Sequence, residues 1–333
     1  MILVTGGTGL TGSHLLLYLV RKNLHVRAIY RNTQSIEKTK NLFKLYSPEN
    51  STLFEQIEWV QADITDISSL EPAFKNIDQI YHAAAIVSFH PKDKNLLHLT
   101  NVMGTENMVN LALEKGIKKF LHISSIAALG QYDNPVTEKT HWNWKEHHSE
   151  YAVTKYLSEM EVWRASQEGL PVVIVNPSII LGAGFWQQGT GKIFQQIEQK
   201  KIRFYPPGGN GFIDVWDLVK TMYTLMESPV TNEAYIVSAY NLSYKNLLNE
   251  IADNLNKPKP KYKIPKWSGK LIGVLNSLPF LRKNIYLSKN LKESLFNITN
   301  YSPEKLIEQF NIQFIPFKSS IRNIAEQYKK HKK

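Results

Sequence analysis

A tyrosine and a lysine four positions apart, Tyr151 and Lys155, could together form a proton-transfer pair. On a helix, residues at this spacing share one face and lie about one turn apart. A nearby ammonium group stabilises a phenolate, and so lowers the pKa of a phenol from its reference value near 10. Ser125 follows an apolar run at 120–123 and could donate a hydrogen bond to a substrate carbonyl. The Tyr-x-x-x-Lys spacing alone is common, so its meaning depends on the rest of the chain.

A glycine-rich segment, residues 5–12 (TGGTGLTG), joins the first apolar run to the first helical pattern. Its glycines match G-x-G-x-x-G at 7, 9 and 12, and the wider G-x-x-G-x-x-G at 6, 9 and 12. A missing Cβ lets the backbone approach a pyrophosphate, which rests on free N–H groups at the helix N-terminus. A tight turn that binds no ligand is the alternative. The predicted cofactor contacts here are Gly6, Thr8, Gly9, Leu10, Thr11 and Gly12.

The segment after the second apolar run bears on cofactor choice. NAD enzymes carry an acidic residue at this point, which binds the ribose 2′-hydroxyl. Residues 26–32 (VRAIYRN) hold no acid, and the next one is Glu37. Arg31 instead suits a 2′-phosphate, because a guanidinium binds phosphate in a forked geometry, and Lys38 is a second basic partner. We therefore predict that NADP(H) is favoured over NAD(H); a solvated surface arginine is the alternative.

Short apolar runs alternate with helical patterns over the first 240 residues. The predicted strands are 1–5, 25–30, 57–61, 78–82, 119–124, 172–176 and 234–238, and the predicted helices include 11–22, 68–75, 95–115, 151–168 and 214–227. Such alternation predicts a parallel sheet covered by helices on both faces. We therefore expect an α/β fold built on a Rossmann-type doubly wound parallel sheet.

Two stretches break this alternation. Residues 183–211 are rich in Gly, Gln and aromatic residues, and residues 241–333 read as mostly helical. We assign both to a smaller, mostly helical C-terminal lobe that binds substrate over one edge of the sheet. The predicted NADP-binding Rossmann domain is then 1–182 plus 212–240, and the predicted substrate-binding lobe is 183–211 plus 241–333.

The composition excludes several classes of chemistry. The chain has 333 residues, 43% of them hydrophobic, and no cysteine. It therefore has no disulfide scaffold, thiolate zinc site, iron–sulfur cluster or cysteine nucleophile. The net charge is +11, but residues 257–333 hold 17 basic and 4 acidic residues, whereas residues 1–256 hold 23 and 25. The excess charge thus belongs to the last quarter, and since no nucleic-acid recognition motif accompanies it, we predict no nucleic-acid partner.

Neither a signal peptide nor a membrane span is expected. The N-terminal apolar run precedes Arg21 and Lys22, whereas a signal peptide has its positive charge first. The long uncharged run at 170–191 contains Asn, Gln, Pro and Gly, which a lipid span avoids. We therefore predict a cytoplasmic protein. The apolar stretch 267–281 has basic flanks, and we expect it to pack in the lobe, with contact to an anionic membrane surface as the alternative.

Taken together, these motifs resemble those of the extended short-chain dehydrogenase/reductase family (NAD-dependent epimerase/dehydratase superfamily). The resemblance runs along essentially the whole chain and is strongest to the dihydroflavonol-reductase-like branch, which includes reductases of ketones, aldehydes and acyl-CoA thioesters. Besides the glycine turn, it rests on Asp63-Ile64, His82 to Ala85, Asn101 to Thr105, Ser124-Ser125, Tyr151 with Lys155 and Glu159, Asn176 to Ser178, and Phe212 to Leu218.

The resemblance implies roles for individual residues. Tyr151 would donate a proton to the substrate carbonyl, Lys155 would tune its pKa and hold the nicotinamide ribose, and Ser125 would stabilise the developing oxyanion. Asn101 completes the predicted catalytic set, with helix stabilisation as its structural alternative. The predicted cofactor contacts also include Arg31, Lys38, Asp63, Ile64, Ala83, Ala84, Ala85, Ser124, Tyr151, Lys155, Pro177 and Ser178.

Departures from relatives narrow the predicted activity. Ser125 is followed by Ile126-Ala127 instead of the Asp-Glu of nucleotide-sugar dehydratases, and residues 209–212 lack the arginine with which epimerases bind a substrate diphosphate. We therefore predict an NADPH-dependent reductase, or reverse dehydrogenase, of a ketone, aldehyde or acyl-CoA-type carbonyl. A nucleotide-sugar epimerase is the alternative within the family, and a non-catalytic NADP-sensing regulator is the alternative of another class. A monomer and a homodimer both stay open.

Aromatic residues near the proposed junction of the two lobes suit an apolar or ring-bearing substrate. Simple packing between the lobes is an equal alternative for each of them. The predicted substrate residues are Val87, Ser88, Phe89, Tyr132, Phe185, Trp186 and Tyr205, with Trp142, Trp144 and Trp216 as further candidates. We predict no metal site, because His90, His147 and His148 lack the surrounding ligands that a metal would need.

Overall fold

The main sheet has seven parallel strands in the order β10-β6-β5-β4-β1-β2-β3. The structure, a computed structural model, describes residues 1–130, 133–265 and 295–332. The strands are β1 (Ile2–Thr5), β2 (Val26–Tyr30), β3 (Glu58–Gln61), β4 (Gln79–His82), β5 (Lys119–Ile123), β6 (Val172–Pro177) and β10 (Glu233–Val237). The order reverses between β1 and β4, and open α/β sheets bind ligands at such a switch point, outside the carboxyl ends of the strands. The predicted Rossmann-type fold is confirmed.

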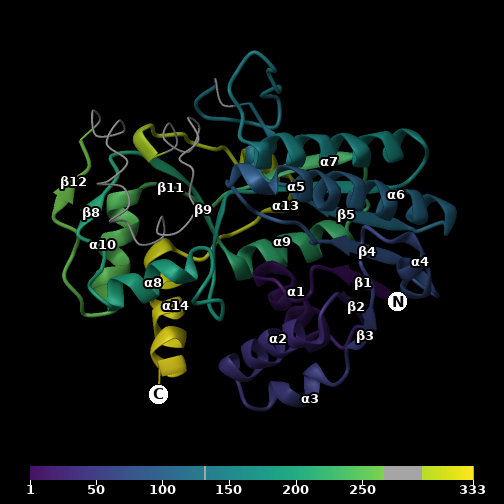
Figure 1. Cartoon of the computed structure of the whole chain (residues 1–333), viewed down its shortest axis with the longest axis horizontal. Helices are drawn as coiled ribbons and strands as arrows, with labels where there is room; N and C mark the ends of the chain where they lie inside the picture. The colour runs from purple at the N-terminus through teal and green to yellow at the C-terminus, as the bar shows by residue number, and fades with distance from the viewer. Residues whose placement is uncertain (131–132, 266–294, 333) are drawn as a thin grey trace.

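Helices cover both faces of this sheet (Figure 1). Helices α1 (Leu10–Arg21), α2 (Thr33–Tyr46), α3 (Asn50–Phe54) and α9 (Val215–Glu227) pack on one face. The other face carries α4 (Ile67–Leu70), the 3₁₀ segment η1 (Glu71–Phe74), α6 (Gly104–Glu114) and α7 (Glu150–Gln167). Neighbouring residues of β1 enter opposite cores, Val4 the first and Leu3 the second. Strands buried on both faces need apolar residues at both alternating positions, which explains their continuous apolar runs.

The predicted helix 95–115 is interrupted. It consists of α5 (Lys94–Leu97), a π-helical segment η3 (His98–Met103) and α6. The hydroxyl of Thr105 donates to the backbone oxygen of Asn101 at 2.6 Å, so a side chain takes up a carbonyl of the π segment. Single-turn π segments often mark functional sites, and this one carries Asn101 toward α7.

Helix α2 was not predicted. Its sequence, TQSIEKTKNLFKLY, is largely polar, and only Thr39, Leu42 and Phe43 are buried. Its start is set by Asn32, whose Oδ1 accepts a hydrogen bond from the backbone N–H of Gln34 at 2.8 Å. A side-chain cap of this kind satisfies one of the free N–H groups at a helix start.

The C-terminal lobe lies beside the sheet (Figure 1). It contains the sheet β11 (Tyr240–Ser243)-β9 (Gly209–Asp214)-β7 (Ile179–Leu181), the pair β12 (Tyr262–Lys263)-β8 (Phe204–Tyr205), and helices α8 (Gly191–Glu198), α10 (Tyr244–Asn254) and α14 (Phe317–Lys332). The lobe has its own apolar core, which joins residues from α8, α10 and α14. Among the described residues, no helix is long and apolar enough to cross a membrane. The segment 267–281 and Tyr132 lie outside the described residues.

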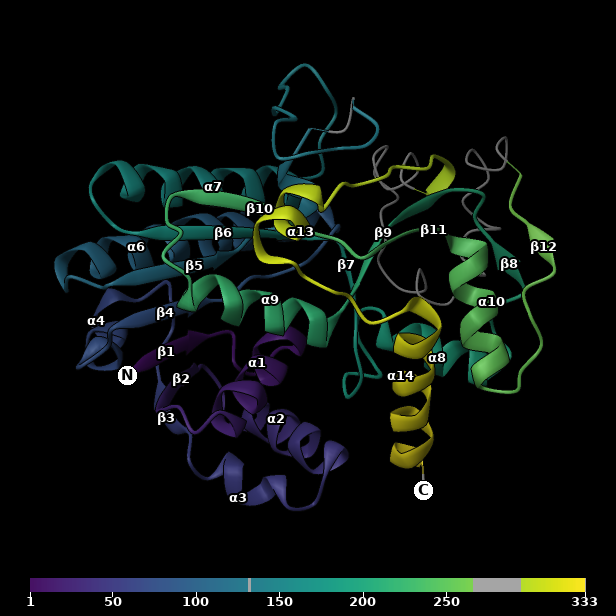
Figure 2. The same cartoon turned by 180° about the vertical axis from the view of Figure 1, so that it is seen from behind.

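The structure differs from the predicted domain division in one respect. Helix α13 (Glu304–Phe310) leaves the lobe and packs on β10 of the main sheet (Figure 2). Leu306 enters the sheet core, the ring of Phe310 lies 5.7 Å from that of Tyr235, and Lys305 donates to the backbone oxygen of Ala234 at 2.8 Å. The last quarter of the chain therefore contributes to both parts of the molecule.

Candidate active site

The turn between β1 and α1 is shaped by glycines that the packing requires. Gly6 has a φ of +68°, and a Cβ there would lie 2.6 Å from the backbone of Ala83 at the end of β4. A Cβ on Gly12 would lie 2.2 Å from the backbone oxygen of Gly6. That oxygen also accepts the N–H of Gly9 at 3.0 Å. The turn therefore sits tightly against the small residues that end β4.

Gly9 differs from these two because the packing does not require it. Its backbone is extended, with φ −98° and ψ 174°, and a Cβ would meet only the oxygen of Gly6 at 3.4 Å, an ordinary contact. It precedes α1, which begins without a side-chain cap and without an acidic residue in its first turn. Free N–H groups and an open approach are what a pyrophosphate needs. The turn, with Thr8, Leu10 and Thr11, therefore fits a dinucleotide cofactor.

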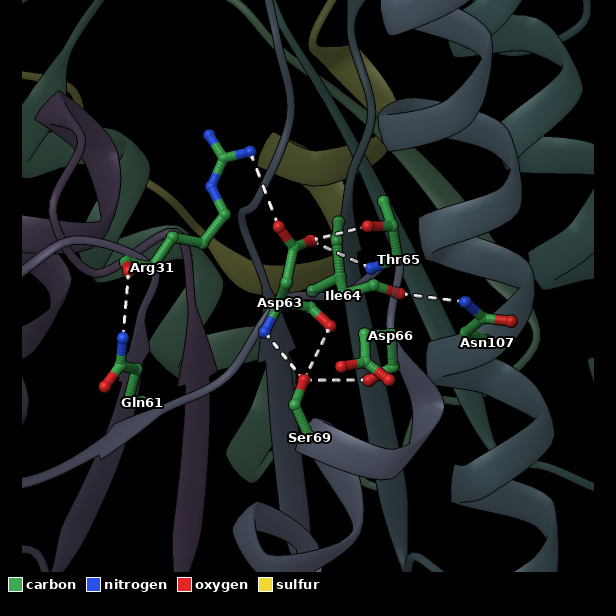
Figure 3. A network of polar contacts seen from close by, with 8 residues as sticks. All are labelled: Arg31, Gln61, Asp63, Ile64, Thr65, Asp66, Ser69 and Asn107. Atoms are coloured by element: carbon green, nitrogen blue, oxygen red, sulfur yellow. Dashed lines mark hydrogen bonds and ion pairs between the residues drawn. The ribbon is translucent and has the colours of Figure 1, made fainter.

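The ends of β2 and β3 form a polar network (Figure 3). Arg31 is 57% exposed, and its Nη1 lies 3.8 Å from Oδ2 of Asp63. The other carboxylate oxygen of Asp63 accepts from the backbone N–H and the hydroxyl of Thr65, both at 2.9 Å. Asp63 thus caps its own turn while it also pairs with Arg31. An exposed guanidinium in one long ion pair stays available for a phosphate.

Two more residues brace this network. Asn107 on α6 donates to the backbone oxygen of Ile64 at 2.9 Å, and Ser69 donates to the backbone oxygen of Asp66 at 2.8 Å while accepting the N–H of Asp63 at 3.0 Å. The sequence offered no signal for Asn107, because its partner is distant in the chain. Lys38 is exposed on α2, so its predicted contact to a 2′-phosphate stays a prediction.

Tyr151 and Ser125 lie together where β5 and α7 meet. Tyr151 is in the first turn of α7, which Ser149 begins by accepting the N–H of Ala152 at 3.1 Å. The Ser125 side chain lies close enough to the Tyr151 hydroxyl to lower its pKa. One turn along α7, Lys155 is 2% exposed and its Nζ donates to the backbone oxygen of Ile123 at 2.9 Å. The sequence spacing of the three residues thus becomes one cluster beside the carboxyl edge of the sheet.

Burial dominates the proton equilibria of this cluster. It raises the pKa of Tyr151, and Ser125 opposes that rise. It lowers the pKa of Lys155 to about 8, against the opposing effect of the Glu159 carboxylate. The sequence predicted that Lys155 lowers the pKa of Tyr151. In this structure the effect of burial is larger, and the pKa of Tyr151 is raised. At neutral pH the phenol is protonated and Lys155 is mostly charged.

The side chain of Asn101, a member of the predicted catalytic set, is held by contacts within the protein. Its Oδ1 accepts the N–H of Ile86 at 2.8 Å, and its Nδ2 donates to the oxygen of Ile86 at 3.0 Å and to the hydroxyl of Thr154 at 3.1 Å. The side chain is 2% exposed. It therefore fastens the chain after β4 to α7, with its polar atoms already occupied.

The remaining predicted cofactor residues line the strand ends. Ala83, Ala84 and Ala85 follow β4, Pro177 ends β6 and Ser178 follows it. Ser124 is 4% exposed, and its hydroxyl donates to the carboxylate of Glu159 at 2.7 Å. It therefore faces away from the edge where Ser125 meets Tyr151. The sequence-based assignment did not foresee this direction.

His82 is a buried connection that the sequence analysis missed. Its Nδ1 lies 2.8 Å from the hydroxyl of Thr5 on β1, and its Nε2 lies 3.1 Å from that of Thr105 on α6. The Thr5 hydroxyl also accepts the N–H of Ala84 at 3.1 Å. Burial lowers the pKa of His82 to about 3, so the ring is neutral and can accept on one side and donate on the other.

The predicted substrate residues separate into two groups. Near the cluster, Phe89 is 37% exposed with its ring 5.8 Å from that of Tyr151, and Val87 is 65% exposed, while Ser88 donates to Asp93 at 2.5 Å. Of the other described candidates, five have packing partners elsewhere that account for their positions without a substrate. Phe185 lies in the sheet core, Trp186 packs on Tyr328, Tyr205 lies under Lys245, Trp142 stacks on His148 and Tyr156, and Trp216 packs on Tyr46. Trp144 is 60% exposed at the surface.

In the described parts of the chain, no three His, Cys, Asp or Glu side chains are placed to hold a metal ion. The chemistry that the cluster can perform is proton transfer to or from an oxygen held between Ser125 and Tyr151. Such an arrangement suits a carbonyl or a secondary alcohol beside a dinucleotide.

Three comparisons bear on this geometry. The model of the NAD dependent epimerase/dehydratase family matches residues 2–242. The chain is 29% identical to a putative dihydroflavonol 4-reductase of Synechocystis over 79% of its length and 75% of the relative's, and 27% identical to sterol demethylase protein B of Methylococcus capsulatus over 79% and 77%. A crystal structure of UDP-glucose 4-epimerase from Thermotoga maritima superposes with a TM-score of 0.79 at 18% identity, covering 100% and 99% of the two chains, which shows the shared fold.

Proposed function

Since this chain belongs to the NAD-dependent epimerase/dehydratase family, whose members act on carbonyl and hydroxyl groups with nicotinamide cofactors, we propose that it is an NADPH-dependent reductase. Its substrate is a ketone, an aldehyde or an acyl-CoA-type carbonyl. The relatives named for a dihydroflavonol and a sterol favour a ring-bearing ketone, and so does the aromatic ring of Phe89 beside Tyr151.

The observation that carries this proposal is that Ser125 lies beside Tyr151, close enough to act on its pKa, one helical turn from the buried Lys155. A bound nicotinamide supplies the hydride. The Tyr151 hydroxyl gives its proton to the substrate oxygen, and the Ser125 hydroxyl donates a hydrogen bond to the same oxygen as negative charge develops on it. The Lys155 ammonium stabilises the phenolate that remains on Tyr151.

Arg31 supports the preference for NADPH. It directly follows β2, at the point where an NAD enzyme has its acidic residue, and it is exposed with one long ion pair to Asp63. When the Arg31 guanidinium leaves Asp63 and binds a 2′-phosphate, two of its N–H groups donate charge-assisted hydrogen bonds to the phosphate oxygens. Asp63 remains held by Thr65 through its other oxygen.

The test is a panel of carbonyl compounds, containing ring ketones, aldehydes and acyl-CoA thioesters, assayed with NADPH and with NADH. We expect loss of NADPH absorbance together with the matching alcohol or aldehyde product. Interconversion of UDP-sugars without net cofactor consumption would instead identify an epimerase. Tight NADPH binding with no turnover on any compound would favour a regulator and contradict the proposal.

A further inference from the structure

Glu159 is a buried carboxylate that the proposed mechanism does not use. It lies on α7 one turn beyond Lys155 and is 6% exposed. One of its oxygens accepts from the hydroxyl of Ser124 at 2.7 Å and from Nδ2 of Asn176 at 2.9 Å, and the Trp163 side chain lies close enough to lower the pKa of the carboxyl group. Buried charges persist in proteins when they are paired and hydrogen-bonded. The donors around Glu159 suit its ionised form, although burial raises its pKa.

These contacts reach the serine that is proposed to bind substrate. Asn176 on β6 donates to Glu159 and also to the backbone oxygen of Ser125 at 3.2 Å. Ser124 joins the same strand through its N–H, which donates to the oxygen of Val175 at 2.8 Å. The Glu159 carboxylate thus holds both serines of the turn after β5. It binds Ser124 directly and Ser125 through Asn176. A shift of Glu159 would move Ser125 relative to Tyr151.

The same carboxylate acts on the charge of Lys155. Burial lowers the pKa of Lys155 to about 8, and Glu159 raises it. The titratable groups that face this lysine from the sheet are His82 on β4 and His122 on β5, and burial keeps both neutral. Tyr151 on the same helix is neutral as well. Within the described residues, Glu159 is the carboxylate whose charge supports the Lys155 ammonium.

We propose that Glu159 is a positioning residue of this site, which keeps Lys155 charged and, through Asn176, holds Ser125 against Tyr151. The proposal rests on the reductase function given above. It separates into an electrostatic part, which depends on the charge of Glu159, and a geometric part, which depends on the Asn176 bridge. Each part has its own variant.

Glu159→Gln tests the electrostatic part, because the amide keeps the size and can still accept from Ser124. Without the negative charge the Lys155 pKa falls further, so the alkaline limb of the pH profile of kcat moves to lower pH by about one unit. Glu159→Asp keeps the charge and leaves that limb in place. Glu161→Gln is the matched control, since Glu161 is on the same helix in an ion pair with Arg164 at 2.9 Å, and it should leave the profile unchanged.

Asn176→Ala tests the geometric part. Ser125 loses one tether while Glu159 keeps its charge, so kcat should fall about 10- to 100-fold with the alkaline limb unmoved. An alkaline limb at the wild-type pH in Glu159→Gln, or full kcat in Asn176→Ala, would overturn the corresponding part. If Glu159→Gln does not fold, Glu159→Met removes the same charge with a side chain of similar length, and the position of its alkaline limb decides the electrostatic part.

A readout without turnover separates this proposal from the reductase function. Lysines carrying ¹³C at Cε are titrated by NMR in the cofactor-free protein, and Lys155 is assigned by its loss in Lys155→Arg. We expect the Lys155 pKa to be lower in Glu159→Gln than in the wild type. That shift in a protein inactive on every carbonyl would refute the reductase and keep the electrostatic role. An equal Lys155 pKa in both proteins would refute the role of Glu159 itself.

Discussion

The hydroxyl of Tyr151 holds its proton at neutral pH, because burial raises its pKa above the ordinary value near 10. A protonated phenol can act as a general acid toward a carbonyl oxygen, whereas oxidation of an alcohol first needs the phenolate. Ser125 and the charge of Lys155 both favour the phenolate as it forms. At the residue scale, the protonated Tyr151 therefore favours reduction of a carbonyl over oxidation of an alcohol at neutral pH.

Arg31 carries the cofactor preference, which a single substitution tests. We expect Arg31→Ala to weaken NADPH binding about 10- to 100-fold, since hydrogen bonds to a charged group contribute about 1.5–3 kcal/mol. NADH, which lacks the 2′-phosphate, should bind with unchanged affinity. Fluorescence titration with both cofactors measures this, with the exposed Arg203→Ala in the lobe as control. Equal loss for both cofactors would show that Arg31 supports the fold instead of the phosphate.

The chemistry-bearing residues could be found in the sequence because they are tied to local patterns. Ser125 follows an apolar strand, and Tyr151 and Lys155 share a helix face. The orientations of Asn101 and Ser124, and the part played by Glu159, could not be found, because their partners lie on other elements. Spacing along one helix fixes a face, whereas hydrogen-bond partners depend on how helices and strands pack.

At the element scale, the strands were predictable and two helical features were not. Buried parallel strands are continuous apolar runs, and all seven were found within a residue or two. Helix α2 is mostly polar and begins at an asparagine cap, so its apolar periodicity is weak. The π segment η3 lies inside a continuous helical pattern, and a one-residue change of winding leaves no clear mark on the sequence.

The glycine turn makes a prediction about two similar substitutions. Gly9→Ala should leave the melting temperature unchanged, because a Cβ there has ordinary contacts and the φ of −98° suits alanine. The same Cβ would occupy the approach to the α1 N-terminus, so NADPH affinity should fall at least about 10-fold. Thermal unfolding and cofactor titration on one preparation measure both effects.

Gly12→Ala serves as the counterpart. Its Cβ would lie 2.2 Å from the backbone oxygen of Gly6, so the turn must distort and the protein should lose about 2 kcal/mol or more of stability. Wild-type NADPH affinity in Gly9→Ala would mean that the cofactor does not approach this turn, and the binding site would have to lie elsewhere.

At the scale of the whole molecule, two aspartates at the start of α9 bind the C-terminal segment that leads into and begins α14. Oδ2 of Asp214 accepts from the hydroxyl of Ser320 on α14 at 2.5 Å, and Oδ2 of Asp217 accepts the N–H of Ile315 at 2.8 Å. Burial raises the pKa of both, that of Asp217 to about 6. Together with α13 on β10, these contacts make the last quarter of the chain part of the main fold, which its strongly basic composition did not indicate.

This junction should make stability depend on pH. The folded-state pKa of Asp217, about 6, lies above its ordinary value of 3.8, so its contribution to stability is complete below pH 3.8 and is lost as the pH rises through about 6. Asp217→Asn stays neutral and can still accept from Ile315. We therefore expect the variant to be about 1–3 kcal/mol more stable than the wild type at about pH 7, and similar at about pH 4.

Urea unfolding at the two pH values measures this difference. Asp253→Asn is the control, because Asp253 is exposed in an ion pair with Lys259 at 2.7 Å. Equal stabilities of wild type and Asp217→Asn at both pH values would show that the charge of the buried Asp217 carboxylate does not destabilise the folded protein.

The central claim is that the Tyr151 hydroxyl supplies the proton for carbonyl reduction. The carbonyl panel repeated with Tyr151→Phe tests it most directly, since the substitution removes one hydroxyl and keeps the ring beside Phe89. We predict NADPH binding within error of the wild type and a loss of kcat of at least about 100-fold on every substrate that the wild type reduces. Turnover in Tyr151→Phe close to that of the wild type would contradict the account.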